Sequence, residues 1–378
     1  MKTENLTVKH KTNTNLNNYV ANCENNLYAW LLLALTTGVG PATQLKLIHH
    51  FGSATNVIHQ DFNTLSQFVN RTIARLIVDK VANHEVEKSL TWAASGPNRY
   101  LLSLEDELYP KELAAISDPP LVLYLQGRIE LLQQHKFAIV GTRHPTGQGA
   151  ENAFKFAKDL ANNRLTIVSG MALGVDCHAH LGALEGCQST IGVIGTGIDI
   201  VYPVANRELF AKVIDQGLLI SEFALKTPPL INNFPRRNRI IAGLSLGCLV
   251  VESAMDGGSL ISANYALEMG REVMALPGSI YNPVARGCHK LIKTGAKLVE
   301  TANDVLEELR LDKIVPLKAD TPITHPVLSV MGFDPIEIDK ICLNLNMSFA
   351  DVCPSLLELE LEGFILNCGG GRYQRIFK

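Results

Sequence analysis

The sequence predicts an α/β protein with a Rossmann-like, doubly wound and mostly parallel sheet, between an N-terminal helical domain and a C-terminal winged-helix domain. Three observations support this fold class. Short apolar runs bounded by glycine alternate with longer helical stretches between residues 100 and 308. These runs are nearly continuous rather than alternating, which is typical of parallel strands covered on both faces. The segments on either side follow a helical pattern instead.

The length and composition indicate several domains. A chain of 378 residues with 47% hydrophobic content is long enough for two or three. We expect a flexible tail over residues 1–25, a helical domain of helix-hairpin-helix or SAM-like type over 26–95, a Rossmann-like domain over 96–312 and a winged-helix domain over 320–378.

The charge and the cysteines restrict the function classes. The formal charge of 34 − 37 = −3 means that an anionic partner must be bound by local cationic clusters rather than by bulk attraction. The polar N-terminus has no apolar signal core, and no uninterrupted apolar stretch is long enough to span a bilayer. Eight scattered cysteines without a CxxC pair favour a reducing compartment over a disulfide framework or zinc ribbon. We therefore expect a cytoplasmic protein that does not contact a membrane.

The segment that follows the expected tail is predicted to form a helical hairpin. An apolar helix leads into Gly38-Val39-Gly40, and Pro41 opens the next helix. Such a turn has two interpretations. Its free N–H groups could meet a phosphate, or glycine is needed only to reverse the chain between packed helices. Lys46 is the only strong cation close by.

The central region supplies the sheet. The expected strands are residues 137–141, 165–170, 189–195, 218–222, 248–253, 272–278 and 297–300, and residues 100–104 and 121–125 add strands or a lead-in hairpin. The expected helices start near Gly147, Val175, Asn206, Arg237, Ser259 and Cys288.

The C-terminal region has the pattern of a winged helix. Helical runs over 335–346 and 349–364 precede two strand-like pieces joined by Gly369–Gly371. Residues 347–363 contain four acidic residues and no Lys or Arg, so the second helix should not enter a DNA groove. The domain is either a packing or protein-interaction module, or it contacts DNA through Arg372 and Arg375.

Glycine-rich turns follow four of the expected strands. They are Gly141-Thr142-Arg143, the turn from Gly170 through Gly174 to Asp176, the turn from Gly195 to Asp199, and Asp256-Gly257-Gly258-Ser259. Because the carboxyl ends of parallel strands form the ligand-binding edge of such sheets, these turns favour an anion. None of them satisfies GxGxxG, and the chain has no GxxxxGK[ST], so neither a dinucleotide cofactor nor a P-loop is supported.

The stretch NFPRRNR (233–239) places Arg236, Arg237 and Arg239 within four positions, ahead of an expected helix. From Phe223 to Val251 there is no acidic residue. Guanidinium groups bind phosphate oxygens bidentately and stack on unpaired bases. The alternative is structural, because Arg143 or Arg239 could pair with Glu222 or Glu252 at the strand ends.

A catalytic or metal site is poorly supported. His178 and His180 follow Cys177, but residues two apart on a helix point to different faces, so satisfied or solvated histidines are the simpler interpretation. Asp176, Asp199 and Glu252 could act as acid or base, yet no nucleophile and base stand in a recognisable arrangement. Asp176 is more simply a helix-start residue that orients its loop.

The succession of motifs resembles the DNA-processing protein A family, also called Smf. It runs through IVGTR, SGMALGVDCHAH, GTGIDIVYPVANREL, SEF, NFPRRNRIIAGLS, VVESAMDGGSLISANYALEMGREVMALPG and GCHKLIKTGAKLV, over about residues 100–305. The resemblance implies a cytoplasmic, non-enzymatic protein of natural transformation without a cofactor. Such proteins bind and protect incoming single-stranded DNA, help to load RecA onto it, and form homodimers through the Rossmann-like domain.

The resemblance also implies site residues. The single-strand groove would be lined by Arg143, Arg237 and Arg239, with further contacts from Gly141, Thr142, Ser169, Gly170, Gly174, Arg236, Asn238 and Ser259. Family members often carry a basic residue directly after the YP of the YPxxN loop. This chain has Val204 there, so we expect a weaker phosphate contact, for which Arg207 substitutes only in part.

Two rival hypotheses remain. The first is an enzyme that binds or cleaves a nucleoside monophosphate, with Glu252 as the carboxylate beside Gly257-Gly258-Ser259. The second is a purely structural scaffold, which would leave the arginine cluster unexplained.

Overall fold

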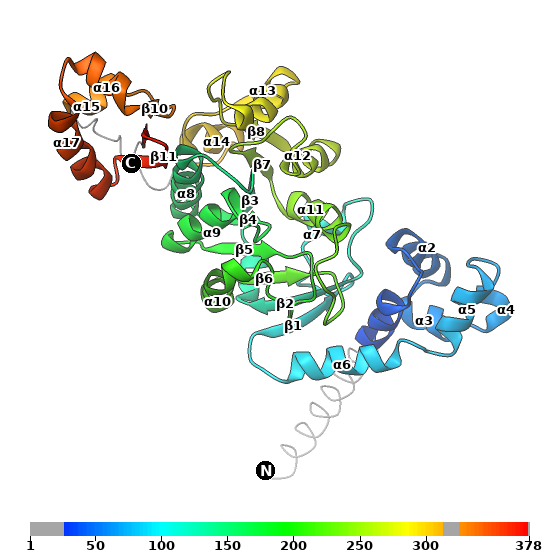
Figure 1. Ribbon diagram of the computed structural model, residues 1–378. Helices are drawn as coiled ribbons and strands as arrows, with labels where there is room; N and C mark the ends of the chain where they lie inside the picture. The colour runs from blue at the N-terminus through cyan, green and yellow to red at the C-terminus, as the bar shows by residue number, and fades with distance from the viewer. Residues whose placement is uncertain (1–25, 313–324, 377–378) are drawn as a thin grey trace, which may run out of the picture. The chain divides into compact units, whose positions relative to one another are not determined.

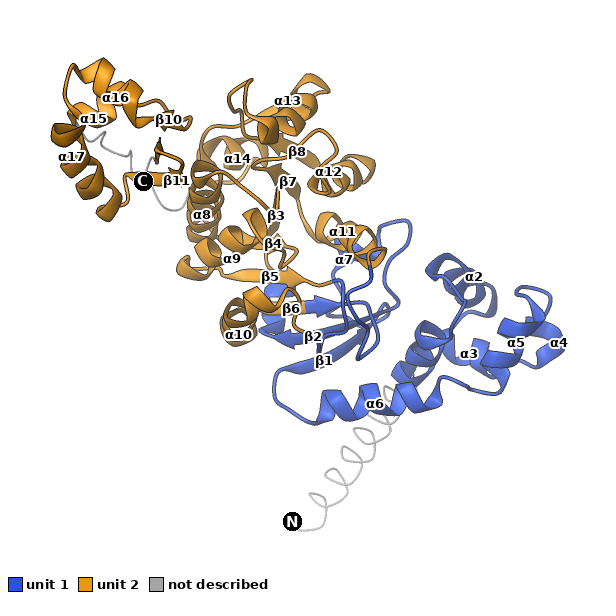
Figure 2. Ribbon diagram, viewed as in Figure 1, with its two compact units in different colours: residues 1–132, 195–200, 220–230 blue, residues 133–194, 201–219, 231–378 orange. Residues whose placement is uncertain are grey.

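The computed structural model of the protein describes residues 26–312 and 325–376 (Figure 1). The chain divides into two compact units (Figure 2). Unit 1 comprises the residues up to 132 together with 195–200 and 220–230, and unit 2 comprises the remainder. The tail expected over residues 1–25 lies outside the described residues. The unit boundaries differ from the expected domain boundaries, because residues 96–132 group with the N-terminal helices and the C-terminal segment groups with unit 2.

Unit 1 begins with the helical hairpin that the sequence predicts. Residues 26–35 are helical, and α2 (Pro41–Phe51) follows a turn in which Gly38 has a φ of 85°. The Gln44 side chain donates a hydrogen bond of 2.7 Å to the Leu33 carbonyl, which joins the two helices. The other elements are α3 (Ala54–Ile58), α4 (Phe62–Leu65), α5 (Arg71–Val78), α6 (Asn83–Ala94), α7 (Lys111–Ala114) and the antiparallel strands β1 (Arg99–Ser103) and β2 (Val122–Gly127).

Unit 2 contains the parallel sheet. Its strands are β3 (Lys136–Val140), β4 (Thr166–Ser169), β5 (Thr190–Val193), β7 (Gly247–Val250), β8 (Glu272–Ala275) and β9 (Lys297–Leu298), in the order β5-β4-β3-β7-β8-β9. Every pairing among these six strands is parallel. β6 (Leu218–Ser221), which runs from unit 2 into unit 1, follows β5 in the strand order. Each expected strand is therefore present, and the mostly parallel sheet is confirmed.

Helices cover both faces of this sheet. They are α8 (Gly147–Asn162), α9 (Val175–Glu185), α10 (Arg207–Gln216), α11 (Asn233–Leu244), α12 (Ser259–Glu268), α13 (Arg286–Lys293) and α14 (Ala302–Glu308), with short 3-10 turns η1 (Ile129–Gln133), η2 (Val204–Asn206) and η3 (Pro283–Ala285). α8, α9 and α14 share one apolar core with alternate residues of β3, β4, β7 and β8. α11 and α12 lie on the other side of the strands (Figure 1). The doubly wound arrangement is confirmed.

The C-terminal segment is a winged helix, as expected. It contains α15 (Pro326–Val330), α16 (Ile338–Leu345), α17 (Phe349–Leu361) and a three-stranded antiparallel sheet of β10 (Ile336–Glu337), β12 (Arg372–Arg375) and β11 (Ile365–Gly369). One expectation was wrong: Ile336 and Glu337 are not helical but form β10, because they pair with Tyr373 and Arg372. Among the described residues, no helix combines the length and apolar character needed to cross a membrane.

The close approach of α8 and α9 depends on Gly182. A Cβ atom at this position would overlap the Phe154 carbonyl group on α8. We predict that Gly182→Ala lowers the free energy of unfolding by about 2–3 kcal/mol, because the two helices must separate. Urea unfolding of the full chain checks this. Gly258→Ala is the matched control, since its Cβ would meet nothing within 4 Å. Equal stability of the two variants would contradict the prediction.

Candidate nucleic-acid interface

The carboxyl ends of β3 and β7 form the switch point of the sheet. β3 pairs with β4 on one side and with β7 on the other, so the chain winds outward from this pair in both directions. The Thr142 N–H donates 2.8 Å to the Glu252 carbonyl, which joins the two loops that leave these strands. Open α/β sheets bind ligands at such a point. The structure therefore places the Gly141-Thr142-Arg143 turn where a ligand is expected.

An exposed cation lies beside aromatic rings at this point. The Arg143 guanidinium carbon is 5.9 Å from the centre of the Phe234 ring, and Arg143 itself is exposed. The Tyr202 and Phe234 rings are 5.6 Å apart and inclined by 36°. Phe234 comes from the first turn of α11, and Tyr202 from the loop before α10. We call Arg143, Phe234 and Tyr202 the stacking cluster. A planar guanidinium and two rings are suited to holding a phosphate and unpaired bases.

Helix geometry divides the arginines of NFPRRNR. The sequence predicted a helix start near Arg237, but α11 begins four residues earlier at Asn233, so all three arginines are helical. Successive residues are rotated by about 100° around a helix, so the three side chains point in different directions. Arg236 is exposed, whereas Arg237 is 5% exposed and Arg239 only 1%. The cluster is therefore not one cationic surface.

Arg237 is a buried cross-link between elements. Its Nη1 donates to the Gly170 carbonyl at 2.5 Å and to the Val193 carbonyl, while its Nε donates to Asn238 Oδ1 at 3.1 Å. A Cβ at Gly170 would come within 2.6 Å of the guanidinium, so glycine is needed there for space. Burial lowers the pKa of Arg237 to about 10, against the opposing effect of Asp176. Arg237 is thus still a cation at neutral pH.

The Gly170–Gly174 turn uses most of its polar groups inside the protein. The N–H groups of Gly170 and Ala172 donate to Asp176 Oδ2 at 3.0 and 3.4 Å, and that of Met171 donates to His180 Nε2 at 3.2 Å. Asn206 Nδ2 donates to the carbonyls of Met171 and Ala172. The expected role of this turn as a phosphate cradle therefore fails for three of its N–H groups.

The two titratable side chains that hold the turn are buried. Burial raises the pKa of Asp176, and the Arg237 charge opposes this rise. Burial, together with the Arg237 charge, lowers the pKa of His180 to about 3. Because His180 Nε2 accepts a hydrogen bond, its proton is on Nδ1, which donates to Thr190 Oγ1 at 2.7 Å. The interpretations of Asp176 as a loop-orienting residue and of His180 as a satisfied histidine are both confirmed.

The other expected site residues mostly shape the turns. Ser169 is fully buried and donates 2.7 Å to the Ile139 carbonyl. Ser259 begins α12 and donates 2.9 Å to Ser253 Oγ. Gly141 leaves space for Val175, which a Cβ would approach within 2.5 Å. Gly174 has a φ of 76° and lies against the Thr142–Arg143 backbone, where a Cβ would come within 2.5 Å of an oxygen. Among all the expected site residues, Arg143 and Arg236 are exposed, and Thr142 and Asn238 are half-buried.

Sequence reasoning did not select Phe234, Tyr202 or Asn206. The signal was present for the first two, because both are aromatic residues within loop motifs that lead into helices. Asn206 has no such signal, since only the fold brings its amide to the Gly170–Gly174 turn.

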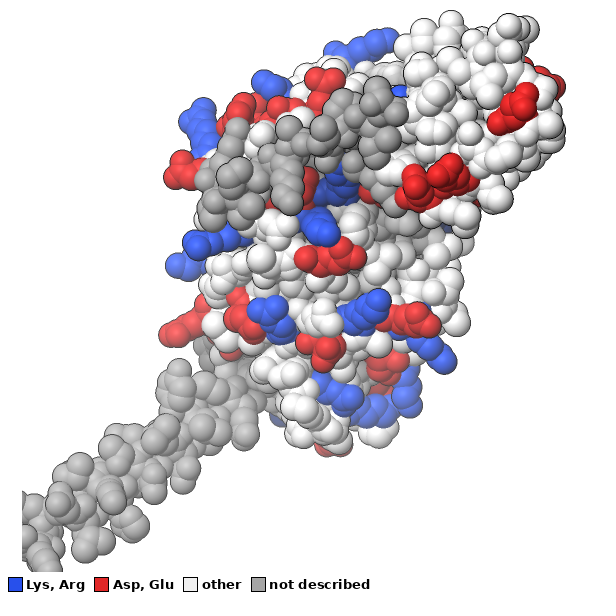
Figure 3. Space-filling model, turned by 90° about the vertical axis from the view of Figure 1, so that its left-hand side faces the viewer, with Lys and Arg blue, Asp and Glu red and all other residues white. Residues whose placement is uncertain are grey.

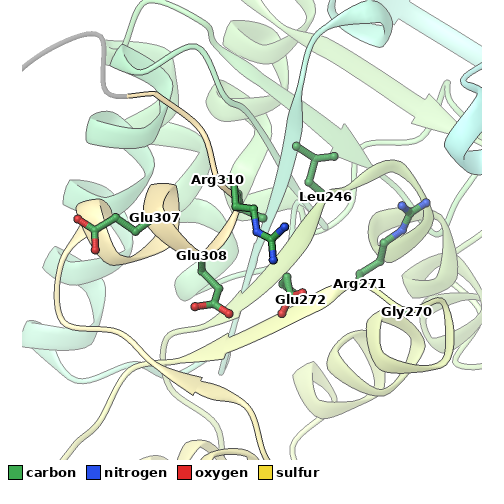
Figure 4. Close-up of a pocket in the computed structure, with 8 residues that line it drawn as sticks. Leu246, Gly270, Arg271, Glu272, Glu307, Glu308 and Arg310 are labelled. Atoms are coloured by element: carbon green, nitrogen blue, oxygen red, sulfur yellow. The ribbon is translucent and has the colours of Figure 1, made fainter.

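A cavity of about 460 Å³ lies at the opposite edge of the sheet (Figure 4). Its lining includes Leu246 and Glu272, near the amino ends of β7 and β8, and Glu307, Glu308 and Arg310 after them in the chain. Arg310 points toward the side where Glu272 and Glu308 lie. The face drawn in Figure 3 likewise mixes cations and carboxylates. Within the described ranges, no three His, Cys, Asp or Glu side chains are grouped to hold a metal.

The buried histidine makes stability depend on pH. His180 has a pKa of about 3 when folded against an ordinary value of 6.5, so the unfolded chain binds more protons between these values and stability falls as pH falls. We predict that the wild type loses about 2 kcal/mol more between about pH 7 and pH 5 than His180→Gln does. Urea unfolding at both pH values checks this. An equal loss in the free energy of unfolding for the wild type and His180→Gln would contradict it. The other histidines are present in both proteins, so their contributions to the pH dependence cancel in the comparison.

Comparisons with known proteins match this architecture. The profile of the family described as DNA recombination-mediator protein A matches residues 100–310, and that of the DprA winged helix domain matches residues 315–371. Protein Smf of Escherichia coli is 40% identical over 76% of this chain and 80% of its own length. DNA processing protein DprA of Streptococcus pneumoniae is 46% identical over 54% of this chain and 73% of its own.

Two solved structures are also similar. The X-ray structure of the S. pneumoniae protein has a TM-score of 0.66 and 36% identity, covering 73% of this chain and 95% of that one. DNA processing protein A of Helicobacter pylori, which binds single-stranded DNA, has a TM-score of 0.51 and 31% identity, covering 56% and 95%. On the family match and the identities to these relatives, the chain belongs to the DNA recombination-mediator protein A (DprA/Smf) family.

Proposed function

We propose that the protein binds single-stranded DNA at the carboxyl edge of the parallel sheet in unit 2. The observation that carries this proposal is the stacking cluster, in which exposed Arg143 lies beside Phe234 and Tyr202 at the switch point of the sheet. The H. pylori relative, which binds single-stranded DNA, supports it.

The chemistry of the cluster favours single strands. Bases can stack on the aromatic rings only when they are unpaired, and Arg143 can then bind a phosphate or stack on a base itself. Arg236 adds an exposed cation on α11, and the buried Arg237 adds a charge behind the surface. Since rings and guanidinium groups accept any base, sequence preference should be weak.

The role of the remaining expected DNA contacts follows from their burial. Arg237 and Arg239 have almost no exposed surface, so we infer that they act by holding α11 in place and by their charge. Val204 is exposed in the YPVAN loop and offers no cation, while Arg207, three residues later, is exposed. We propose that Arg207 supplies the phosphate contact of this loop in part.

We predict that Arg143→Ala weakens binding to a labelled thymidine oligomer about tenfold and reduces the slope of log affinity against log salt by about 0.7. Phe234→Leu should weaken binding by a similar factor while leaving the salt slope unchanged, because it removes stacking and no charge. Fluorescence anisotropy over a salt series measures both effects, with a matching duplex for comparison.

Arg310→Ala is the matched control, because Arg310 is an exposed arginine that lines the cavity at the opposite edge of the sheet. Its affinity should equal that of the wild type. Thermal unfolding verifies that all three variants remain folded. Wild-type affinity in both Arg143→Ala and Phe234→Leu would refute the site, and absence of single-strand binding by the wild type would refute the function.

In the cell, we propose a cytoplasmic, non-enzymatic role in natural transformation. The protein would protect incoming single-stranded DNA and help to load RecA onto it. The exposure of Arg143 and Tyr202 suits this role, because a strand held by its bases and a few phosphates can be handed to another protein.

We further propose that the protein forms a homodimer through β9. β9 ends the strand order of the sheet, so its outer edge has unpaired backbone groups, and Leu298 on it is exposed. Leu298→Asp should therefore convert a dimer into a monomer in light scattering, whereas Val81→Asp, at an exposed apolar residue of unit 1, should not. A dimer that persists in Leu298→Asp would contradict this interface.

The rival nucleotide enzyme depends on Glu252. This carboxylate is buried and accepts hydrogen bonds from Thr146 N at 2.9 Å and Thr146 Oγ1 at 2.7 Å, so it already supports the start of α8. A catalytic carboxylate needs access to the ribose, and these contacts disfavour it. We predict that incubation with AMP releases no adenine, as chromatography would detect. Adenine release that Glu252→Gln abolishes would support the enzyme instead.

A further inference from the structure

The last helix of the winged helix, α17, has an exposed apolar stripe. Phe349 and Leu357 on α17 are each 58% exposed, and Leu361 is 81% exposed. Cys353, four residues after Phe349 and four before Leu357, is also exposed. The four residues are spaced by four positions, so each is rotated by only about 40° from the one before, and together they form a continuous stripe about 18 Å long.

The residues of this stripe are not part of the apolar core of the winged helix. The side chains that α17 contributes to the core are Val352, Leu356 and Leu359, which pack with residues of α15, α16 and β11. The stripe therefore lies on a different side of the helix. Large apolar side chains on an exposed helix face are uncommon unless a partner covers them. Met347, in the turn before α17, is exposed as well and extends the apolar surface.

Carboxylates border the stripe. Glu358 and Glu362 are exposed beside its C-terminal half, at Leu357 and Leu361, and residues 347–363 contain no Lys or Arg. In a DNA-binding winged helix this helix enters the major groove, where phosphates would repel such a surface. An apolar stripe with carboxylates along one side instead complements a helix with leucines on one face and lysines or arginines beside them.

We propose that the α17 stripe (Phe349, Cys353, Leu357 and Leu361) binds a basic amphipathic helix of a partner protein. Leucines of the partner would cover the stripe, and its cations would face Glu358 and Glu362. This interaction uses a surface remote in sequence from the stacking cluster and does not depend on the proposed DNA binding.

Cys353 and Cys187, which are the exposed thiols among the described residues, allow a test with the unmodified full chain. The probe is a peptide of about 14 residues made of leucine and lysine, with the leucines on one helical face. It should slow alkylation of Cys353 by iodoacetamide, read by mass spectrometry, and leave Cys187, which is exposed at the end of α9, unchanged. A peptide of the same composition with the leucines distributed around the helix is the control. Equal protection by both peptides, or none by the first, overturns the proposal.

Variants identify the surface. Leu357→Ser with Leu361→Ser should weaken peptide binding about tenfold in fluorescence anisotropy, and Glu358→Gln with Glu362→Gln should weaken it and reduce its salt dependence. Leu108→Ser, at an exposed leucine of unit 1, should bind as the wild type does. Unchanged binding in the stripe variants overturns the proposal.

Two other occupants of the stripe would give distinct results. If the leucine variants lose affinity for the thymidine oligomer, the stripe contacts DNA and the proposal is wrong. If they abolish a dimer seen by light scattering and the peptide does not compete with it, a second copy of the chain is the occupant and the proposal is also wrong. Unchanged DNA binding and oligomeric state, with lost peptide binding, support it.

Discussion

The buried Arg237 guanidinium is the interaction on which the rest of the binding edge depends. It joins α11 to the carbonyl groups at the ends of β4 and β5, and its charge faces Asp176, which in turn holds two N–H groups of the Gly170–Gly174 turn. A buried charge of this kind is tolerated only when its donors are satisfied, and removing it would leave Asp176 buried without a cation. The first turn of α11 places Phe234 beside Arg143, so the exposed stacking cluster depends on the buried Arg237.

At the proposed binding edge, the residues that hold the turns in place are therefore different from those that would contact a ligand. Most polar groups of the Gly170–Gly174 turn are hydrogen-bonded to four buried side chains, those of Asp176, His180, Asn206 and Arg237. Because these side chains are buried, they hold the turn rigid, and the groups that they bind are not available to a ligand. Met171 shows how firmly it is held, because it keeps a left-handed φ of 56° without being glycine. What remains for a ligand is side chains, chiefly one guanidinium and two rings. We propose that such a surface binds single strands of many sequences, because rings and guanidinium groups stack on any base.

Two surfaces of unit 2 differ in their charges. At the carboxyl edge of the sheet, Arg143 and Arg236 are exposed near aromatic rings. On α17, carboxylates border an apolar stripe, and the helix that reads DNA in other winged helices has no cation. We therefore propose that polynucleotide and protein partners bind to different domains of the chain.

The sequence by itself determined the fold class, the order of strands and helices and the winged helix, and it selected Arg143 as a candidate contact. Glycine-bounded apolar runs and local periodicity depend only on neighbouring residues, and these carry that information. The tertiary structure decided which of the clustered arginines reach the surface. α11 starts at Asn233 because the packing of the fold stabilises one extra turn, and a rotation of about 100° per residue then sends Arg237 and Arg239 inward and Arg236 outward. The meeting of Phe234 with Tyr202 and the hydrogen bonds from Asn206 join residues about 30 positions apart, and no local pattern encodes contacts made across such a separation.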